Sequence, residues 1–176
     1  MGVLMVECVF RFEGLDVEIA PDALETMMSH RQNGFFSSEA GGQMFARLSP
    51  GKWRIEVATG LRRGDRRGRF HFWPNRKAEQ DEINTYFKQG LDFVGDWHTH
   101  PESRPSPSNA DYRSVANVVR ESTHELPGML MCIVGREDPP EGLWMSFHLR
   151  DGRVATVQHP HGAVFDISVR RRRRFI

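Results

Sequence analysis

The chain has 176 residues, with 24 lysine and arginine side chains, 23 aspartate and glutamate side chains and a formal net charge of +1. This length allows one domain with its own core, and the near-neutral charge argues against a dedicated nucleic-acid-binding protein. Its two cysteines, Cys8 and Cys132, lie far apart in apolar runs, which indicates buried reduced thiols. No apolar stretch reaches membrane-spanning length and no signal-peptide pattern opens the chain, so we expect a soluble cytoplasmic protein.

The first third of the chain predicts four strands and one helix. Apolar, β-branched and aromatic residues from Val3 to Phe12 predict a first strand, and Val17 to Ile19 predicts a short second one. A helix should start at Pro21 and end near Asn33-Gly34, a typical C-terminal signal. The segment from Phe35 to Leu48 should turn into a strand, and Trp53 to Ala58 alternates like its hairpin partner.

Arginine is concentrated in the segment 60–75, at Arg62, Arg63, Arg66, Arg67 and Arg69. We expect a long exposed loop here, and such loops in compact domains are often functional. The arginines could bind an acidic substrate surface, with Phe70, Phe72 and Trp73 beside an extended tail. A solvated basic loop with anchored aromatic residues explains the same pattern without any function.

The second half alternates helices and strands. Lys77 to Gln89 predicts an amphipathic helix, and the apolar run Leu91 to Val94 predicts a buried strand that leads into the segment 95–111. Ser108 to Glu121 should form the next helix, and Met129 to Val134 a central strand. A last hairpin should join the segments 143–149 and 154–157. The sequence therefore predicts a single-domain α/β protein with a mixed sheet in residues 1–169, followed by a basic tail of residues 170–176.

Two histidines stand at the end of the strand that begins at Leu91. A strand places residues i and i+2 on one face, so His98 and His100 can point at the same site. Asp111 follows in the first turn of the next helix, and the proline-rich loop can return the chain to the strand end. Two imidazoles and one carboxylate leave a fourth tetrahedral position for water, as in a catalytic zinc site.

Hydrolysis at such a site also needs a general base and a donor for the developing oxyanion. Glu39 is the best candidate base, because Gly41-Gly42 allows its backbone to approach an active site closely. Ser108, on the same loop as Asp111, is the best candidate donor.

Each of these residues also has a purely structural interpretation. A single His-x-His pattern is weak evidence for a metal, and Glu39 could be an ordinary exposed carboxylate. Ser108 and Asp111 have the spacing of a helix capping box, which requires no metal. Their joint occurrence with the histidine pair nevertheless favours a catalytic site.

These residues resemble the motif of the JAMM/MPN (JAB) metalloprotease family, in which His-x-His is followed after seven residues by serine and after two more by aspartate, with an upstream glutamate. The resemblance covers roughly residues 21–134, and Gly95 to Pro101 is most similar to the short bacterial members. It implies α-β-α layers around a mixed sheet, a deaminase-like architecture. It also implies one zinc ion bound by His98, His100 and Asp111, with Glu39 as general acid/base and Ser108 stabilising the oxyanion.

The resemblance further implies cleavage of an isopeptide or peptide bond after the C-terminal tail of a ubiquitin-like or otherwise conjugated protein. The short bacterial branch resembles deconjugases of antiphage operons, such as the CBASS member that releases a conjugated cGAS-like nucleotidyltransferase. Activating and conjugating enzymes of the same operon are the partners this implies. Two alternatives stay open, a peptidase that processes a sulfur-carrier precursor and a metal-free MPN-type scaffold. The basic tail, at Arg170 to Arg174, is expected to be solvated rather than bound to nucleic acid.

Overall fold

The computed structural model describes residues 8–34, 37–68 and 71–157. Its main sheet contains the strands β1 (Cys8–Phe12), β2 (Leu15–Ile19), β3 (Gly41–Ser49), β4 (Lys52–Ala58), β7 (Asp92–Thr99), β8 (Gly128–Val134), β9 (Leu143–Leu149) and β10 (Val154–Val157). The helices are α1 (Pro21–Ser29), α2 (Arg76–Phe87) and α3 (Asn109–Glu121). A separate hairpin is formed by β5 (Arg66–Gly68) and β6 (His71–Trp73).

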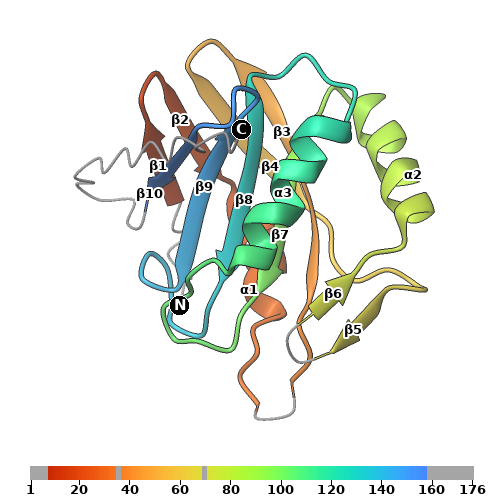
Figure 1. Ribbon diagram of the computed structural model, residues 1–176, viewed down its shortest axis with the longest axis vertical. Coiled ribbons are helices and arrows are strands. Elements are labelled where there is room, and N and C mark those ends of the chain that lie inside the picture. The colour runs from red at the N-terminus through yellow and green to blue at the C-terminus, as the bar shows by residue number, and fades with distance from the viewer. Residues whose placement is uncertain (1–7, 35–36, 69–70, 158–176) are drawn as a thin grey trace, which may run out of the picture.

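The sheet has the strand order β1-β2-β4-β3-β7-β8-β9-β10 and is mixed, as the sequence predicted (Figure 1). The pairs β2–β4 and β7–β8 are parallel, whereas the other neighbours are antiparallel. The hairpin predicted between β3 and β4 is present, and so is the one between β9 and β10. The strand β7 therefore lies near the middle of the sheet, with a partner on each side.

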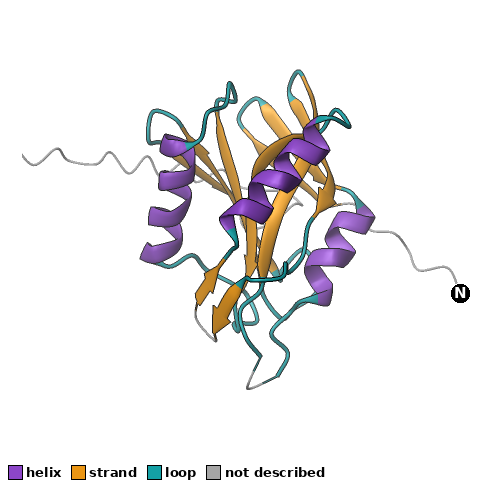
Figure 2. Cartoon of the chain, turned by 90° about the vertical axis from the view of Figure 1, so that its right-hand side faces the viewer, coloured by secondary structure: helices purple, strands orange, loops and turns teal. Residues whose placement is uncertain are grey.

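Helices cover both faces of the sheet (Figure 2). The α1 side chains Ala23, Leu24 and Met27 are buried in the larger core, together with side chains from one face of the sheet. On the other face, Val115 and Val119 of α3 pack against β8 side chains in a second core. The third helix, α2, lies beside α3 on this second face. The predicted α/β architecture with helical layers around a mixed sheet is confirmed.

Two predicted elements differ from the structure. The first helix ends at Ser29, before the predicted Asn33-Gly34, because His30 occupies the C-cap position. Its backbone N–H donates to Met27 O at 3.2 Å, the next N–H, of Arg31, donates to Met28 O at 3.3 Å, and the His30 Nδ1 lies 2.8 Å from Thr26 O. These contacts satisfy carbonyls at the helix end without a glycine.

The arginine-rich segment is not simply a loop, because it contains the hairpin of β5 and β6. Arg62 is also not a solvated cation, since its side chain is only 6% exposed and bonds to Glu82 at 2.6 and 2.7 Å. The predicted basic tail, 170–176, lies outside the described residues. Within the described part of the chain, no helix is long and apolar enough to cross a membrane.

Candidate metal centre

Both histidines of the motif stand at the C-terminal end of β7. The antiparallel register pairs His98 with Gly41 of β3, and the parallel register pairs it with Ile133 of β8. His100 follows the strand, and its backbone N–H donates to Val134 O at 2.9 Å. Both imidazoles are thus attached to the central, best-supported part of the sheet.

Glu39 is held against this strand end by Thr99, which lies between the two histidines and is fully buried. The backbone N–H of Ala40 donates to Thr99 Oγ1 at 3.0 Å, and the N–H of Thr99 donates to Ala40 O at 2.8 Å. The N–H of Glu39 itself donates to Gly68 O at 2.7 Å. The carboxylate therefore comes from a segment bonded to both β7 and the β5–β6 hairpin.

Asp111 enters the site from the first turn of α3, and it forms a capping box with Ser108. The N–H of Asp111 donates to Ser108 Oγ at 3.2 Å, and the N–H of Ser108 donates to Asp111 Oδ2 at 2.6 Å. The structural interpretation of this spacing is therefore correct. It does not exclude a second role, because a hydroxyl that accepts a hydrogen bond still has its proton to donate.

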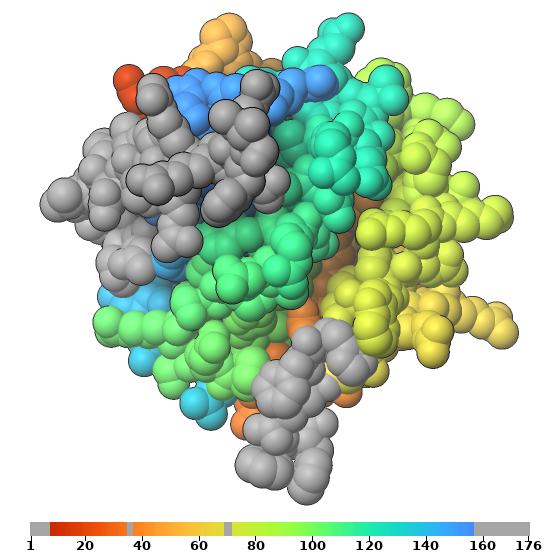
Figure 3. Space-filling model, in the orientation of Figure 1, coloured from red at the N-terminus to blue at the C-terminus, as the bar shows by residue number. Residues whose placement is uncertain are grey.

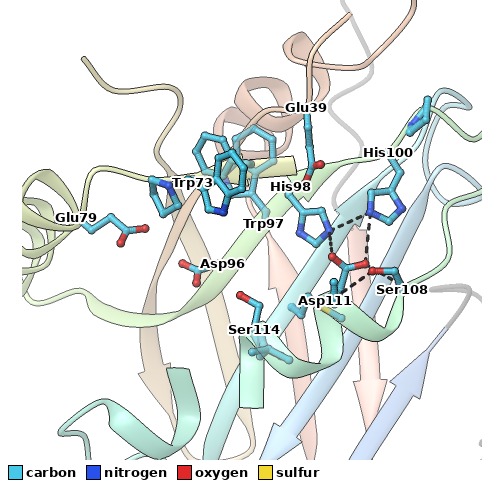
Figure 4. A pocket seen from close by; sticks show the side chains of 18 of the residues that line it. Glu39, Trp73, Glu79, Asp96, Trp97, His98, His100, Ser108, Asp111 and Ser114 are labelled. Carbon is cyan, nitrogen blue, oxygen red and sulfur yellow. Dashed lines mark hydrogen bonds and ion pairs between the residues drawn. The ribbon is translucent and has the colours of Figure 1, made fainter. Parts of the chain in front are cut away.

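The five predicted residues lie together at one end of a cavity of about 510 Å³ (Figure 4). His98 Nε2 is 3.2 Å from His100 Nε2 and 3.2 Å from Asp111 Oδ1, and His100 Nε2 is 3.5 Å from Asp111 Oδ2. One ligand atom each from Glu39, His98 and His100 lies within 4.8 Å of the others. The side chains converge on a space that one ion can occupy.

Burial and charge give the acidic groups different proton affinities. Burial raises the pKa of Glu39 to about 7. The neighbouring His98 acts to lower this pKa, and the negative charge of Asp111 acts to raise it further. Burial would also raise the pKa of Asp111, but its contacts with His98 and Ser108 outweigh burial and hold the pKa well below its usual range. Burial, followed by the charge of His98, lowers the pKa of His100. The histidine therefore favours its neutral form, which is the form that binds metals.

The donor set fits a metal of the zinc type. Two imidazoles and a carboxylate are common zinc ligands, and they leave a further position open. His100 Nδ1 also lies 3.2 Å from Glu102 Oε2. A carboxylate on the second ring nitrogen orients an imidazole and makes it a better ligand. Glu102 was missed from the sequence, although its place two residues after His100 could have suggested it.

The cavity extends away from this site between α3 on one side and α2 with β6 on the other. Figure 3 shows it as a furrow between the green α3 and the yellow-green α2. Phe72 and Trp73, which were predicted to flank a substrate tail, line it. Asp96 and Glu79 also line the far part of the cavity, and no sequence pattern pointed to either residue.

The fold and the site together define a class, a single-domain mixed α/β protein with a histidine, histidine and carboxylate centre suited to metal-dependent hydrolysis. A family model described as "Prokaryotic homologs of the JAB domain" matches residues 20–148. The chain therefore belongs to the prokaryotic JAB family, a branch of the JAMM/MPN metalloproteases.

Relatives named as isopeptidases match most of the chain. A CD-NTase/cGAS isopeptidase of Escherichia coli is 31% identical over 137 residues, covering 69% of this chain and 78% of the relative. A second CD-NTase/cGAS isopeptidase, from Vibrio cholerae, is 31% identical over 149 residues, covering 76% of this chain and 85% of the relative. The solution structure of protein DSY2949 from Desulfitobacterium hafniense has a TM-score of 0.58 at 20% identity, covers 78% of this chain and 87% of that one, and supports the fold.

Proposed function

We propose that the protein is a zinc-dependent isopeptidase that releases a CD-NTase/cGAS-like enzyme from its conjugates in a cytoplasmic antiphage system of the CBASS type. The observation that carries the proposal is the convergence of Glu39, His98, His100 and Asp111 on one space at the end of a cavity. The names of the relatives add the substrate class.

In this proposal His98, His100 and Asp111 hold the zinc ion. When bound, the ion supplies a Lewis acid that polarises the scissile carbonyl and acidifies water. Glu39 accepts a proton from the attacking water and returns it to the leaving lysine nitrogen. Its raised pKa, about 7, suits a group that must both accept and donate a proton near neutral pH.

Ser108 is the proposed donor to the oxyanion. Its Oγ already accepts the N–H of Asp111, which holds the oxygen in place and leaves its proton to donate. A donor that is oriented before the reaction stabilises developing charge without a reorganisation cost. The capping box therefore supports this role rather than competing with it.

The test combines cleavage with metal content. The substrate is a protein whose C-terminal glycine is joined to a lysine Nε, and zinc is measured in the purified enzyme. We expect wild type to hold one zinc and cleave the bond, Asp111→Ala to lose zinc, and Glu39→Gln to keep zinc but lose at least about a hundredfold in turnover.

Four outcomes would contradict the proposal. Wild type without stoichiometric zinc, or zinc unchanged in the His98→Ala, His100→Ala double variant, would remove the metal site. Near-normal cleavage by Glu39→Gln would remove Glu39 from the mechanism. Cleavage of a sulfur-carrier precursor, but not of the isopeptide, would make the protein a processing peptidase.

A further inference from the structure

The far part of the cavity contains two carboxylates that the hydrolytic mechanism does not use. Asp96 and His98 are two residues apart on β7, so their side chains lie on the same face of the sheet. Glu79 of α2 borders the cavity from the opposite wall and is only 7% exposed. In Figure 4 the carboxylates of Asp96 and Glu79 lie on the side of the site away from Ser108.

Asp96 lacks the partner that a shielded carboxylate normally has. Its Oδ1 is closed off from bulk solvent and has no hydrogen-bond partner in the described part of the chain. A shielded polar atom without a partner is costly, and native structures keep few of them. Oδ1 itself faces away from solvent, but the side chain as a whole is only partly buried and lines the cavity, so a ligand that enters there can reach the carboxyl group from its open side.

Each neighbouring cation is already paired with a carboxylate other than Asp96. Arg76 bonds to Glu79 at 2.9 Å, and its side chain is 72% exposed. Arg62 bonds to Glu82 through two nitrogens and lies 4.0 Å from Asp65. Among the residues that line this end of the cavity, Asp96 and Glu79 are acidic and Arg76 is basic, so one carboxyl group exceeds the basic groups there.

We infer that Asp96, assisted by Glu79, is a specificity-determining residue that binds a lysine or arginine side chain of the substrate close to the scissile bond. The inference rests on the proposed isopeptidase function and deepens it by naming the charge of the substrate segment. A guanidinium or ammonium group supplies the donors that Asp96 lacks and balances the excess of acidic groups.

The spacing on β7 sets where the basic residue stands. Residues i and i+2 of a strand are about 6.6 Å apart, so Asp96 lies about one such step from His98. An extended substrate in the cavity places side chains on one face at the same interval. A basic side chain about two residues from the scissile bond therefore reaches Asp96, while the bond lies at the histidine end.

The test uses synthetic isopeptides whose terminal glycine is joined to a lysine Nε. One peptide carries arginine two residues before the bond, a second carries arginine beside the acceptor lysine, and each has a matched version with citrulline, the neutral isostere. For at least one of the two positions, we expect wild type to cleave the arginine peptide with a kcat/KM roughly ten- to a hundredfold higher than that of the citrulline peptide. This ratio corresponds to the free energy of one charge-assisted hydrogen bond. The preferred position tells which side of the bond enters the acidic end.

Asp96→Asn should reduce this preference to less than about threefold while leaving cleavage of the citrulline peptides nearly unchanged. Glu79→Gln should reduce it partly and provides a second variant if Asp96→Asn folds poorly. Asp92→Asn removes a carboxylate from the same strand outside this cavity and should change nothing. Equal rates for arginine and citrulline peptides, or a preference that persists in Asp96→Asn, would overturn the inference.

Binding separates this inference from the proposed function. Calorimetric titration of the Glu39→Gln protein with the same peptides should show the arginine preference, and adding Asp96→Asn should abolish it. If wild type cleaves no peptide but this binding difference remains, the isopeptidase proposal fails and the acidic subsite stands. If wild type cleaves all peptides without preference and binding shows none, the subsite fails and the isopeptidase stands.

Discussion

Glu39 is a carboxylic acid with only 8% of its surface exposed, next to a second carboxylate and two imidazoles. Burial disfavours its charged form, which explains why its pKa rises from 4.5 to about 7. A protein that only needed stability would place an apolar residue here. The cost of keeping this carboxylate is evidence that the residue serves the site.

This cost is measurable as a pH-dependent difference in stability between metal-free wild type and metal-free Glu39→Gln. Because the folded pKa is above the unfolded value, the contribution of Glu39 is most favourable below pH 4.5 and is lost as pH rises through about 7. We therefore expect Glu39→Gln to gain stability relative to wild type between these values, by up to about 3 kcal/mol at pH 8. Urea unfolding at pH 5 and pH 8 measures this gain.

The matched control is Glu121→Gln, which removes a carboxylate whose side chain is 70% exposed at the end of α3. It should show no comparable dependence on pH. A stability difference between wild type and Glu39→Gln that stays constant from pH 5 to pH 8 would contradict the raised pKa.

The residues of the centre differ in how far the sequence could predict them. His98, His100, Ser108 and Asp111 carry a spaced motif and Glu39 stands beside Gly41-Gly42, so their proximity could be expected from the sequence alone. Thr99, which bonds to the segment of Glu39, and Asp96, at the far end of the cavity, have no such spacing signal. The neighbours of Thr99 and Asp96 are determined by the register in which β3 pairs with β7, and no local sequence pattern shows this register.

At the scale of elements, the N-terminus of α3 is both a helix cap and part of the site. Ser108→Ala should remove the hydroxyl and cost about 1 kcal/mol of stability, because alanine is a poor N-cap residue. Ser108→Gly removes the same hydroxyl at a cost of only a few tenths of a kcal/mol. If the hydroxyl donates to the oxyanion, both variants should lose about a hundredfold in kcat.

Thermal unfolding and isopeptide cleavage, measured on the same preparations, separate the two effects. If the loss of activity instead parallels the loss of stability, so that Ser108→Gly cleaves at nearly the wild-type rate, Ser108 acts only as a helix cap. Zinc content should stay near wild type in the glycine variant, since Asp111 remains on an intact first turn.

The contact between β3 and β7 depends on Gly42, which pairs with Trp97. A Cβ at this position would lie 1.9 Å from Thr59 O and 2.9 Å from Trp97 Nε1. The Trp97 indole donates to the same Thr59 carbonyl at 2.9 Å, so neither neighbour can yield without losing a hydrogen bond.

We expect Gly42→Ala to destabilise the protein by about 3 kcal/mol or more and to displace Glu39, which lies three residues upstream. Denaturant unfolding and cleavage rates measure the two effects. Gly60→Ala is a milder comparison, because its Cβ would meet only the His30 ring at 3.1 Å. A Gly42→Ala protein with normal stability would show that β3 can move away from this contact.

Element prediction succeeded where the signal is local and failed where it depends on tertiary contacts. The apolar run before the histidines and the Asp-Gly turn between β9 and β10 carry their own signals. The parallel pairing of β2 with β4 joins segments separated by a helix and a strand, so no local pattern indicates it. The hairpin of β5 and β6 was missed because both strands have only three residues, and the arginine-rich β5 lacks the apolar alternation of a half-buried strand.

At the scale of the whole molecule, the hydrophobic cores are separate from the candidate metal site. Both hydrophobic cores are formed by side chains other than the candidate ligands, and they extend across the sheet under α1 and α3. The candidate ligands come from the end of β7, the residue after it and the first turn of α3. A metal there connects elements that the cores already hold together, in contrast to small zinc domains that unfold without their metal.

Metal removal should therefore weaken the fold without abolishing it. Chelation with EDTA should lower the melting temperature but leave the far-ultraviolet circular dichroism of a folded protein, and added zinc should restore stability. Zinc at about a thousand times its dissociation constant contributes about 4 kcal/mol, because it binds only the folded state. The His98→Ala, His100→Ala variant should melt at the same temperature with zinc or with EDTA, since its site is lost while its cores are intact. If chelation alone unfolds the wild-type protein, the metal is structural, and the hydrophobic cores do not hold the fold together without it.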